Sequence, residues 1–256
     1  MKIKRGWVAA FVLVVVVVAF VVAGLFWYAR QKPLKPSEQT IVLVHGLLNK
    51  PFVMKNIAKT LREAGYPVYN WGYPSTAHTI EEHAASLDKF VTRINTNKRI
   101  HFVGYSQGAI VIRYMLTHYH VPNAGRFVMI GPPNHGSELA ERFYHYAWFR
   151  MLYGHKSIKE LFPDRKEFFK ECGIPKLEFG IIAGGAGNKE GYSDHLPGDD
   201  DGMVSVESAH LENAADFILL DHRHLPLVFA DDTARQTLHF IQTGEFARTH
   251  VSSSHR

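Results

Sequence analysis

The sequence predicts an α/β fold, in which a mostly parallel β-sheet is covered by helices on both faces. Two observations predict it. From about residue 40 onward, short apolar runs rich in β-branched residues alternate with amphipathic patterns of helical period. The connections between these segments are short, and the chain contains no internal repeat. Alternation of this kind is typical of βαβ units, whose strands run parallel.

The individual elements follow from these patterns. The predicted strands cover residues 40–45, 66–71, 100–105, 126–130, 177–183 and 217–220. The predicted helices cover residues 53–64, 79–95, 108–118 and 232–243. Gly65 and Gly244 follow the first and the last helix, where glycine commonly ends a helix. Either Asp232 or Thr233 is the predicted N-cap of the last helix.

Between residues 138 and 175 the alternation stops and aromatic residues become frequent. We expect a helical cap insertion here instead of another βαβ unit. Aromatic side chains in such a segment either pack the cap onto its own domain or line an apolar pocket.

The N-terminal segment predicts a transmembrane helix. Residues 6–29 carry no charge, and about 20 apolar residues at 1.5 Å rise span a bilayer core of about 30 Å. A cleaved signal peptide is the alternative, although its apolar region is usually shorter, about 7–15 residues. The basic residues are tied at three on each side of the span. Because the tail before the span is very short, we expect a signal anchor with the following domain periplasmic or otherwise extracytoplasmic.

The chain is therefore expected to consist of a membrane anchor with its flanks, 1–35, and one folded domain, 36–256, with the cap at about 138–175. The formal net charge is +5, but residues 1–35 hold six bases and no acid, which leaves 23 bases and 24 acids in the rest. A near-neutral domain argues against a nucleic-acid partner, which needs a clustered basic face. The single cysteine, Cys172, allows no intrachain disulfide, and we expect it to be structural.

The clearest motif is Gly104-Tyr105-Ser106-Gln107-Gly108, which follows a predicted strand and opens a predicted helix. A G-x-S-x-G sequence in a strand-turn-helix context places its serine on a sharp, strained turn with an exposed hydroxyl. The N-terminus of the helix behind that serine favours developing negative charge. Ser106 is thus the predicted nucleophile.

Acyl transfer also requires N–H groups that stabilise a tetrahedral oxyanion. One donor is predicted to be the N–H of Gln107, directly after the nucleophile. The other is predicted in the loop after His45-Gly46, most plausibly at Leu47. The His45 ring itself is expected to hydrogen-bond loop backbone and to shape this site.

A serine nucleophile needs a base, and the base needs an orienting acid. In a domain with a G-x-S-x-G turn, the chain order is serine, then Asp or Glu, then His. Asp201 is the predicted acid because it directly precedes Gly-Met-Val, with Asp199 and Asp200 as competitors. The base should follow the last strand, where His224 is preferred and His222 is the alternative. Three adjacent carboxylates could alternatively bind Ca²⁺, but no partner ligands occur at loop spacing, so no metal is expected.

The sequence resembles bacterial lipases and esterases of the α/β-hydrolase superfamily. The resemblance rests on VLVHGLL, HFVGYSQGAIVIRY, IGPPNHGSELA, DGMVSVESA and the closing histidine, helix and TGEF. It implies the α/β-hydrolase fold, supports Asp201 through the Asp-Gly-hydrophobic-Val pattern, and favours His224 by its distance from the final helix. Many relatives carry a small residue beside the base, where this chain has Arg223-His224-Leu225. Asn134 and His135 are expected either to line the active-site pocket or to hold their loop.

Together these features predict a serine hydrolase that cleaves carboxylic esters, lipid-like ones in particular, through an acyl-enzyme and without a cofactor. The same residues could serve a thioesterase, an amidase or a transacylase. A non-catalytic binding module on this fold is a further alternative, and it would be expected to lack one of the three side chains. The expected partners are an ester or lipid substrate and a membrane.

Overall fold

The structure is a computed structural model that describes residues 18–20, 22, 35–94 and 97–248. By its contacts the chain divides into two units, Met1–Lys35 and Pro36–Arg256. The transmembrane helix predicted over residues 6–29 lies almost entirely outside the described residues. Among the residues that are described, no helix has the length and apolarity that crossing a membrane requires.

The second unit contains one six-stranded sheet in the order β2-β1-β3-β4-β5-β6, and every neighbouring pair is parallel. The strands are β1 Gln39–Val44, β2 Val68–Trp71, β3 Arg99–Tyr105, β4 Ala124–Ile130, β5 Phe179–Gly185 and β6 Asp216–Asp221. Each of the six predicted strands is present, and none of their ends differs from the prediction by more than two residues. The expectation of a mostly parallel sheet flanked by helices is confirmed.

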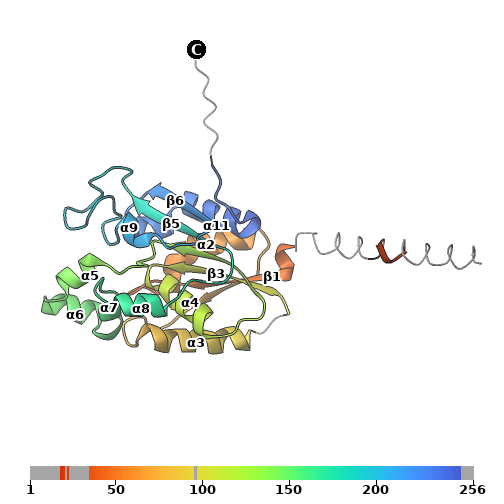
Figure 1. The fold of residues 1–256 in the computed structure, drawn as a ribbon, viewed down its shortest axis with the longest axis horizontal. Coiled ribbons are helices and arrows are strands. Elements are labelled where there is room, and N and C mark those ends of the chain that lie inside the picture. Colours follow the sequence, from red (N-terminus) through yellow and green to blue (C-terminus); the bar gives the residue numbers. More distant parts are fainter. Residues whose placement is uncertain (1–17, 21, 23–34, 95–96, 249–256) are drawn as a thin grey trace, which may run out of the picture. The chain divides into compact units, whose positions relative to one another are not determined.

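Helices cover the sheet on both faces (Figure 1). They are α2 Lys55–Glu63, α3 Ile80–Arg93, α4 Gln107–His118, α9 Val206–Ala209, α10 His224–Phe229 and α11 Asp231–Thr243, with short 3₁₀ turns η1 Pro36–Glu38 and η2 Pro51–Met54. Strand β1 shows how the layers form. Val42 and Val44 pack with α3 and α4, whereas Ile41 and Leu43 pack with α2 and α11. A strand buried on both faces needs a continuous apolar run, which explains the sequence of β1.

The first and last helices differ from expectation at one point each. The segment predicted as a helix over residues 53–64 begins as the 3₁₀ turn η2 and becomes α-helical at Lys55. Helix α11 begins at Asp231, so the prediction of Asp232 or Thr233 as its N-cap is wrong. The Asp232 carboxylate instead bonds to the ring of His222, 2.9 Å away. The short helices α9 and α10 were not predicted.

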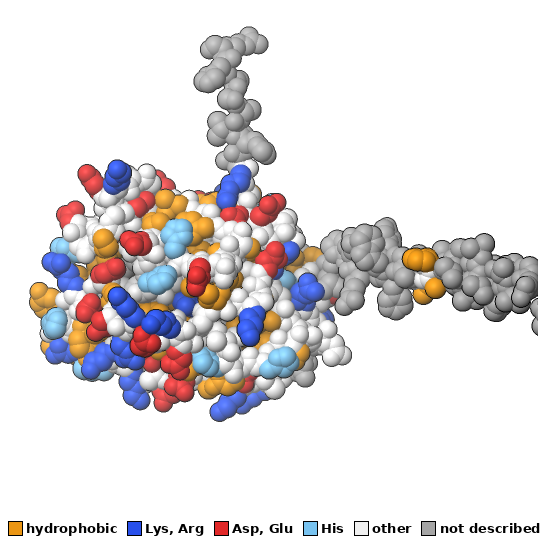
Figure 2. Space-filling model, in the orientation of Figure 1, with side chains coloured by type: hydrophobic (Ala, Val, Ile, Leu, Met, Phe, Trp, Pro, Cys, Tyr) orange, Lys and Arg blue, Asp and Glu red, His pale blue; other side chains and the backbone are white. Residues whose placement is uncertain are grey.

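The segment between β4 and β5 is helical, and its helices are α5 Glu138–Phe143, α6 Ala147–Tyr153, α7 Lys156–Glu160 and α8 Lys166–Glu171. Its inner aromatic residues form a small cluster around Phe149. On the face drawn in Figure 2, basic and acidic side chains are interspersed over the domain.

Glu160 makes one of the hydrogen bonds that join this cap to the body of the domain. The N–H of Ile80, in the first turn of α3, donates to Glu160 Oε2 at 2.7 Å. Burial raises the pKa of Glu160 to about 7, although the same hydrogen bond opposes that shift. An acid with a raised folded-state pKa stabilises the fold below its ordinary pKa, and this contribution is lost as the pH rises through the folded-state value.

We therefore expect Glu160→Gln to be about as stable as the wild type at about pH 4, below the ordinary pKa of a glutamate. It should be more stable by on the order of 1 kcal/mol at about pH 8.5, allowing for partial solvent exposure of the carboxylate. Urea unfolding at both pH values measures the difference. Glu141→Gln, an exposed change in the same cap, is the control and should show no such dependence. Equal stability of wild type and Glu160→Gln at both pH values would contradict the expectation.

Candidate active site

The loops after β1 and β3 meet at the carboxyl end of the sheet. Strand β1 has β2 on one side and β3 on the other, so the loops leaving β1 and β3 diverge at this point. Crevices at such points are the usual ligand sites of open α/β sheets. His45, Gly46 and Leu47 follow β1, and Ser106 follows β3.

Ser106 lies on the turn between β3 and α4 with φ 53° and ψ −126°, a strained backbone conformation for a residue with a side chain. The turn is possible because both flanking positions lack a side chain. A Cβ at Gly104 would lie 2.5 Å from Ala109 Cα, and one at Gly108 would lie 2.3 Å from Val44 O. The strand-turn-helix geometry that the motif predicts is present, and it presents the Ser106 hydroxyl at the end of the sheet.

The structure brings Ser106, His224 and Asp201 together in one chain of hydrogen bonds. Ser106 Oγ lies 3.0 Å from His224 Nε2, and His224 Nδ1 lies 2.6 Å from Asp201 Oδ2. With Asp201 ionised, Nδ1–H donates to the carboxylate and Nε2 is left to accept the hydroxyl proton. The imidazole is mostly enclosed and the carboxylate is buried, with side-chain exposures of 12% and 1%. This arrangement can remove a proton from Ser106 and stabilise the resulting imidazolium.

Backbone groups hold the Asp201 carboxylate in place. Its Oδ1 accepts hydrogen bonds from the N–H groups of Met203 and Val204, at 2.9 and 2.8 Å. The main-chain carbonyl oxygen of Asp201 accepts a hydrogen bond from the N–H of His224 at 2.7 Å. The base is fixed on the other side by Tyr105, whose hydroxyl donates to the His224 carbonyl at 3.0 Å. Both partners of the His224–Asp201 pair are thus positioned by main-chain bonds.

The competing candidates lie elsewhere. The His222 ring bonds to Asp232 and not to Ser106. The Asp199 carboxylate accepts from the N–H groups at positions 186, 187 and 200, and the Asp200 carboxylate accepts from those of Ser193 and Gly202. Both therefore organise the loop that carries Asp201.

The two predicted oxyanion donors flank Ser106. Among the described residues, neither the Leu47 N–H nor the Gln107 N–H has a protein acceptor. A Cβ at Gly46 would lie 3.0 Å from Ser106 Cβ, so any larger residue would require Ser106 or its neighbours to shift. His45 behaves as expected of a structural residue. Its Nδ1 bonds to the Gly46 carbonyl at 2.9 Å, and burial lowers its pKa, which keeps the ring neutral.

A cavity of about 240 Å³ opens at Ser106 and His224. The cap supplies one wall of it, through Ala140, Phe149, Tyr153, Ile158 and Leu161. Leu48 and Leu225, both exposed, also line this cavity. The surroundings of the hydroxyl are thus largely apolar.

The loop that carries Asn134 and His135 lies between two cavities. Asn134 and His135 do not line the Ser106 cavity; they line a second cavity on the far side of their loop. Pro133 and Ser137 of the same loop face Ser106 instead. Cys172 is buried, and burial raises the pKa of its thiol to about 12, as fits a structural role.

Several residues that shape this site carry little signal in the sequence. Tyr105 was only a variable position of the motif, yet its hydroxyl holds His224. Gly131 has φ 54°, and a Cβ there would lie 3.2 Å from the His224 ring. A glycine directly after a buried strand is the sequence signal that could have identified this position.

Comparison with known proteins supports these assignments of fold. A profile of the palmitoyl protein thioesterase family matches residues 40–166, a span that contains Ser106 but neither Asp201 nor His224. The mature lipase BlEst2 of Bacillus licheniformis superposes with a TM-score of 0.67 at 22% identity, over 83% of this chain and 95% of the lipase. The chain has the α/β-hydrolase fold. The predicted resemblance to bacterial lipases and esterases is confirmed at the level of fold.

Two further structures share this α/β-hydrolase architecture. Phospholipase PlaB of Legionella pneumophila matches with a TM-score of 0.61 at 14% identity, over 81% of this chain and 60% of the phospholipase. The lipase of Staphylococcus hyicus matches with a TM-score of 0.57 at 13% identity, over 82% and 93%. Comparison with curated proteins finds no match. At these identities the likeness concerns the fold, and the activity is argued from the site itself.

Proposed function

We infer that this α/β-hydrolase is a serine esterase that cleaves carboxylic esters of lipid-like acyl groups through an acyl-enzyme. The observation that carries the inference is the hydrogen-bonded chain from Ser106 to His224 to Asp201, set on a strained turn beside two N–H groups without protein acceptors. An ordinary turn between a strand and a helix would not need to combine these features.

The proposed reaction has two halves, acylation and deacylation of Ser106, and His224 transfers protons in both. His224 Nε2 takes the proton of Ser106 as Oγ attacks the ester carbonyl carbon. The Leu47 and Gln107 N–H groups stabilise the oxyanion, and the alcohol leaves with the proton from His224. Water then gives a proton to His224 and attacks the acyl-enzyme. The carboxylic acid departs, and Ser106 recovers its proton.

The cavity indicates the size of the acyl group. The cavity has a volume of about 240 Å³ and largely apolar walls, so an acyl chain of medium length should fit it better than a short or a very long one. We expect an octanoyl ester to give a higher kcat/KM than the matching butanoyl and hexadecanoyl esters.

The side chains of helix α6 favour a substrate that reaches the enzyme at an apolar surface. Its inner residues, Phe149 and Tyr153, line the Ser106 cavity, whereas Trp148, Met151 and Leu152 are exposed. Exposed large apolar side chains clustered beside a binding cavity commonly mark a contact with lipid or another partner. On this helix they lie next to the place where an acyl chain would enter.

The experiment that tests the proposal compares octanoyl esters dissolved in buffer with longer esters dispersed as droplets. The double variant Trp148→Ser/Met151→Ser should lower kcat/KM about tenfold on droplets, because less apolar surface is buried there, and should leave kcat/KM on the dissolved octanoyl ester unchanged. Phe52→Ser, an exposed aromatic change on η2, is the matched control. Equal loss on dissolved and dispersed esters would remove the interfacial part of the proposal.

A thioesterase is the second candidate, because the palmitoyl protein thioesterase profile covers the nucleophile region. The same residues would expel a thiolate in place of an alkoxide. Matched octanoyl oxygen ester, thioester and amide substrates separate the possibilities. Faster cleavage of the thioester than expected from its intrinsic reactivity would favour this second function, and no cleavage of any of the three would reject both.

We also propose that residues 6–29 anchor the enzyme in a membrane with the domain on the extracytoplasmic side. The support is the uncharged length of that segment and its flanking aromatic residues. Added protease should digest the domain in spheroplasts; a protected domain would reverse the orientation.

A further inference from the structure

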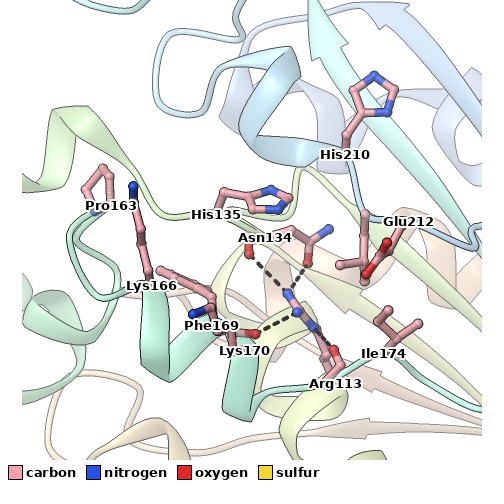
Figure 3. A pocket seen from close by; sticks show the side chains of 12 residues that line it. Arg113, Asn134, His135, Pro163, Lys166, Phe169, Lys170, Ile174, His210 and Glu212 are labelled. Carbon is pink, nitrogen blue, oxygen red and sulfur yellow. Dashed lines mark hydrogen bonds between the residues drawn. The ribbon is translucent and has the colours of Figure 1, made fainter.

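A second and larger cavity, of about 850 Å³, lies on the other side of the loop between β4 and α5. It is bounded by α8, by the segment 173–174 and by residues 210–212 (Figure 3). Ser106 and His224 do not line it. Its volume falls in the range of ordinary ligand sites, about 300–1,000 Å³, and the reaction proposed above makes no use of it.

A buried arginine forms part of the lining. Arg113, on α4, is 3% exposed. Its guanidinium donates to the carbonyls of Gly173, Asn134 and Phe169 at 2.6, 3.1 and 2.9 Å, and to Asn134 Oδ1 at 3.2 Å. All four acceptors are uncharged. Since a guanidinium has five N–H donors, these bonds leave one donor over.

No carboxylate of the described chain lies within ion-pair distance of Arg113. Cys172 is close enough to affect it electrostatically, but the raised pKa of the thiol keeps it neutral. A buried cation without a counter-charge is costly, because desolvation is not repaid by an ion pair. An anion in the adjoining cavity would supply the missing charge.

The rim of the cavity adds further positive charge. Lys166 and Lys170, both on α8, line it beside Arg113, and Glu212 is the single acid of the lining. Lys170 also contacts Glu167, but an ion pair this exposed contributes little to stability. Figure 3 shows Lys166 and Lys170 on one side of the cavity and His210 and Glu212 on the other. The walls between them include apolar residues such as Phe169, Ile174 and Leu211.

We propose that this cavity binds an organic carboxylate with an apolar chain. The cations favour the carboxylate, and the apolar walls favour the chain; a small inorganic anion would leave those walls in contact with water. The site is separate from the Ser106 cavity, because Asn134 and His135 face one cavity while Pro133 and Ser137 face the other.

Isothermal titration of the full-length protein with octanoate at low ionic strength tests the proposal. Lys166→Glu/Lys170→Glu should weaken octanoate binding about tenfold, since two charges on the rim are reversed while the fold-supporting Arg113 is kept. Lys59→Glu/Lys89→Glu, a pair of exposed changes on α2 and α3, is the charge-matched control and should bind as the wild type does. Leu225→Trp, which narrows the Ser106 cavity, should also retain this binding.

Two ligand controls complete the test. Octan-1-ol should bind much more weakly than octanoate, because it lacks the charge, and acetate should bind more weakly because it lacks the chain. Unchanged octanoate binding in Lys166→Glu/Lys170→Glu, equal binding of octan-1-ol, or loss of binding in Leu225→Trp alone would each overturn the proposal. The readout is binding alone, and Leu225→Trp distinguishes this site from the Ser106 cavity, in which the octanoyl group of the proposed substrate would lie.

Discussion

Replacing Ser106 with alanine is expected to lower kcat for ester hydrolysis by about 10⁴- to 10⁶-fold, because the attacking hydroxyl is lost and only binding and oxyanion stabilisation remain. The substitution removes one oxygen atom and leaves the backbone of the turn as it is. Steady-state assays with a dissolved octanoyl ester measure the change.

Ser86→Ala is the matched control, because Ser86 is exposed on α3, away from the site. It should retain wild-type kcat. Circular dichroism and thermal unfolding should show both variants folded. Residual activity of Ser106→Ala within tenfold of the wild type would mean that another group carries the reaction.

Replacing His224 with alanine is expected to reduce kcat by a similar factor, about 10⁴- to 10⁶-fold, since no other base lies within hydrogen-bond distance of Ser106 Oγ in the described chain. His222→Ala is a close control, two residues away in the same segment. It breaks the contact with Asp232 but leaves the bond between His224 and Ser106, so its kcat should stay within about tenfold of the wild type.

The two histidine variants together decide the assignment of the base. A large loss in His222→Ala with near-normal activity in His224→Ala would contradict the structure. Comparable loss in both would point instead to a segment between β6 and α10 that cannot tolerate substitution, and thermal unfolding would reveal it.

The fold and the nucleophile could be predicted because their signals are local. The β-branched runs mark the strands, and the two glycines around Ser106 are required by contacts only a few residues away or with the neighbouring strand. The order of serine, acid and base along the chain then narrowed the choice to a few adjacent residues at Asp199–Asp201 and at His222 or His224.

The choice within those sets depends on non-local contacts. His222 is turned towards Asp232 and His224 towards Ser106 because α10 starts at His224, and no local pattern predicted that helix. The larger cavity was missed for a similar reason. Arg113 lies in an ordinary helical pattern, and its acceptors are carbonyl groups 21 to 60 residues away in sequence.

The central claim is that the Ser106 hydroxyl is made nucleophilic by His224. Mass spectrometry of the protein after treatment with a fluorophosphonate probe tests it most directly, because such probes phosphonylate an activated serine. We expect one phosphonyl group, on the peptide that contains Ser106, and greatly slowed labelling in His224→Ala but not in His222→Ala. Labelling on another residue, or labelling of Ser106 at the same rate without His224, would contradict the account.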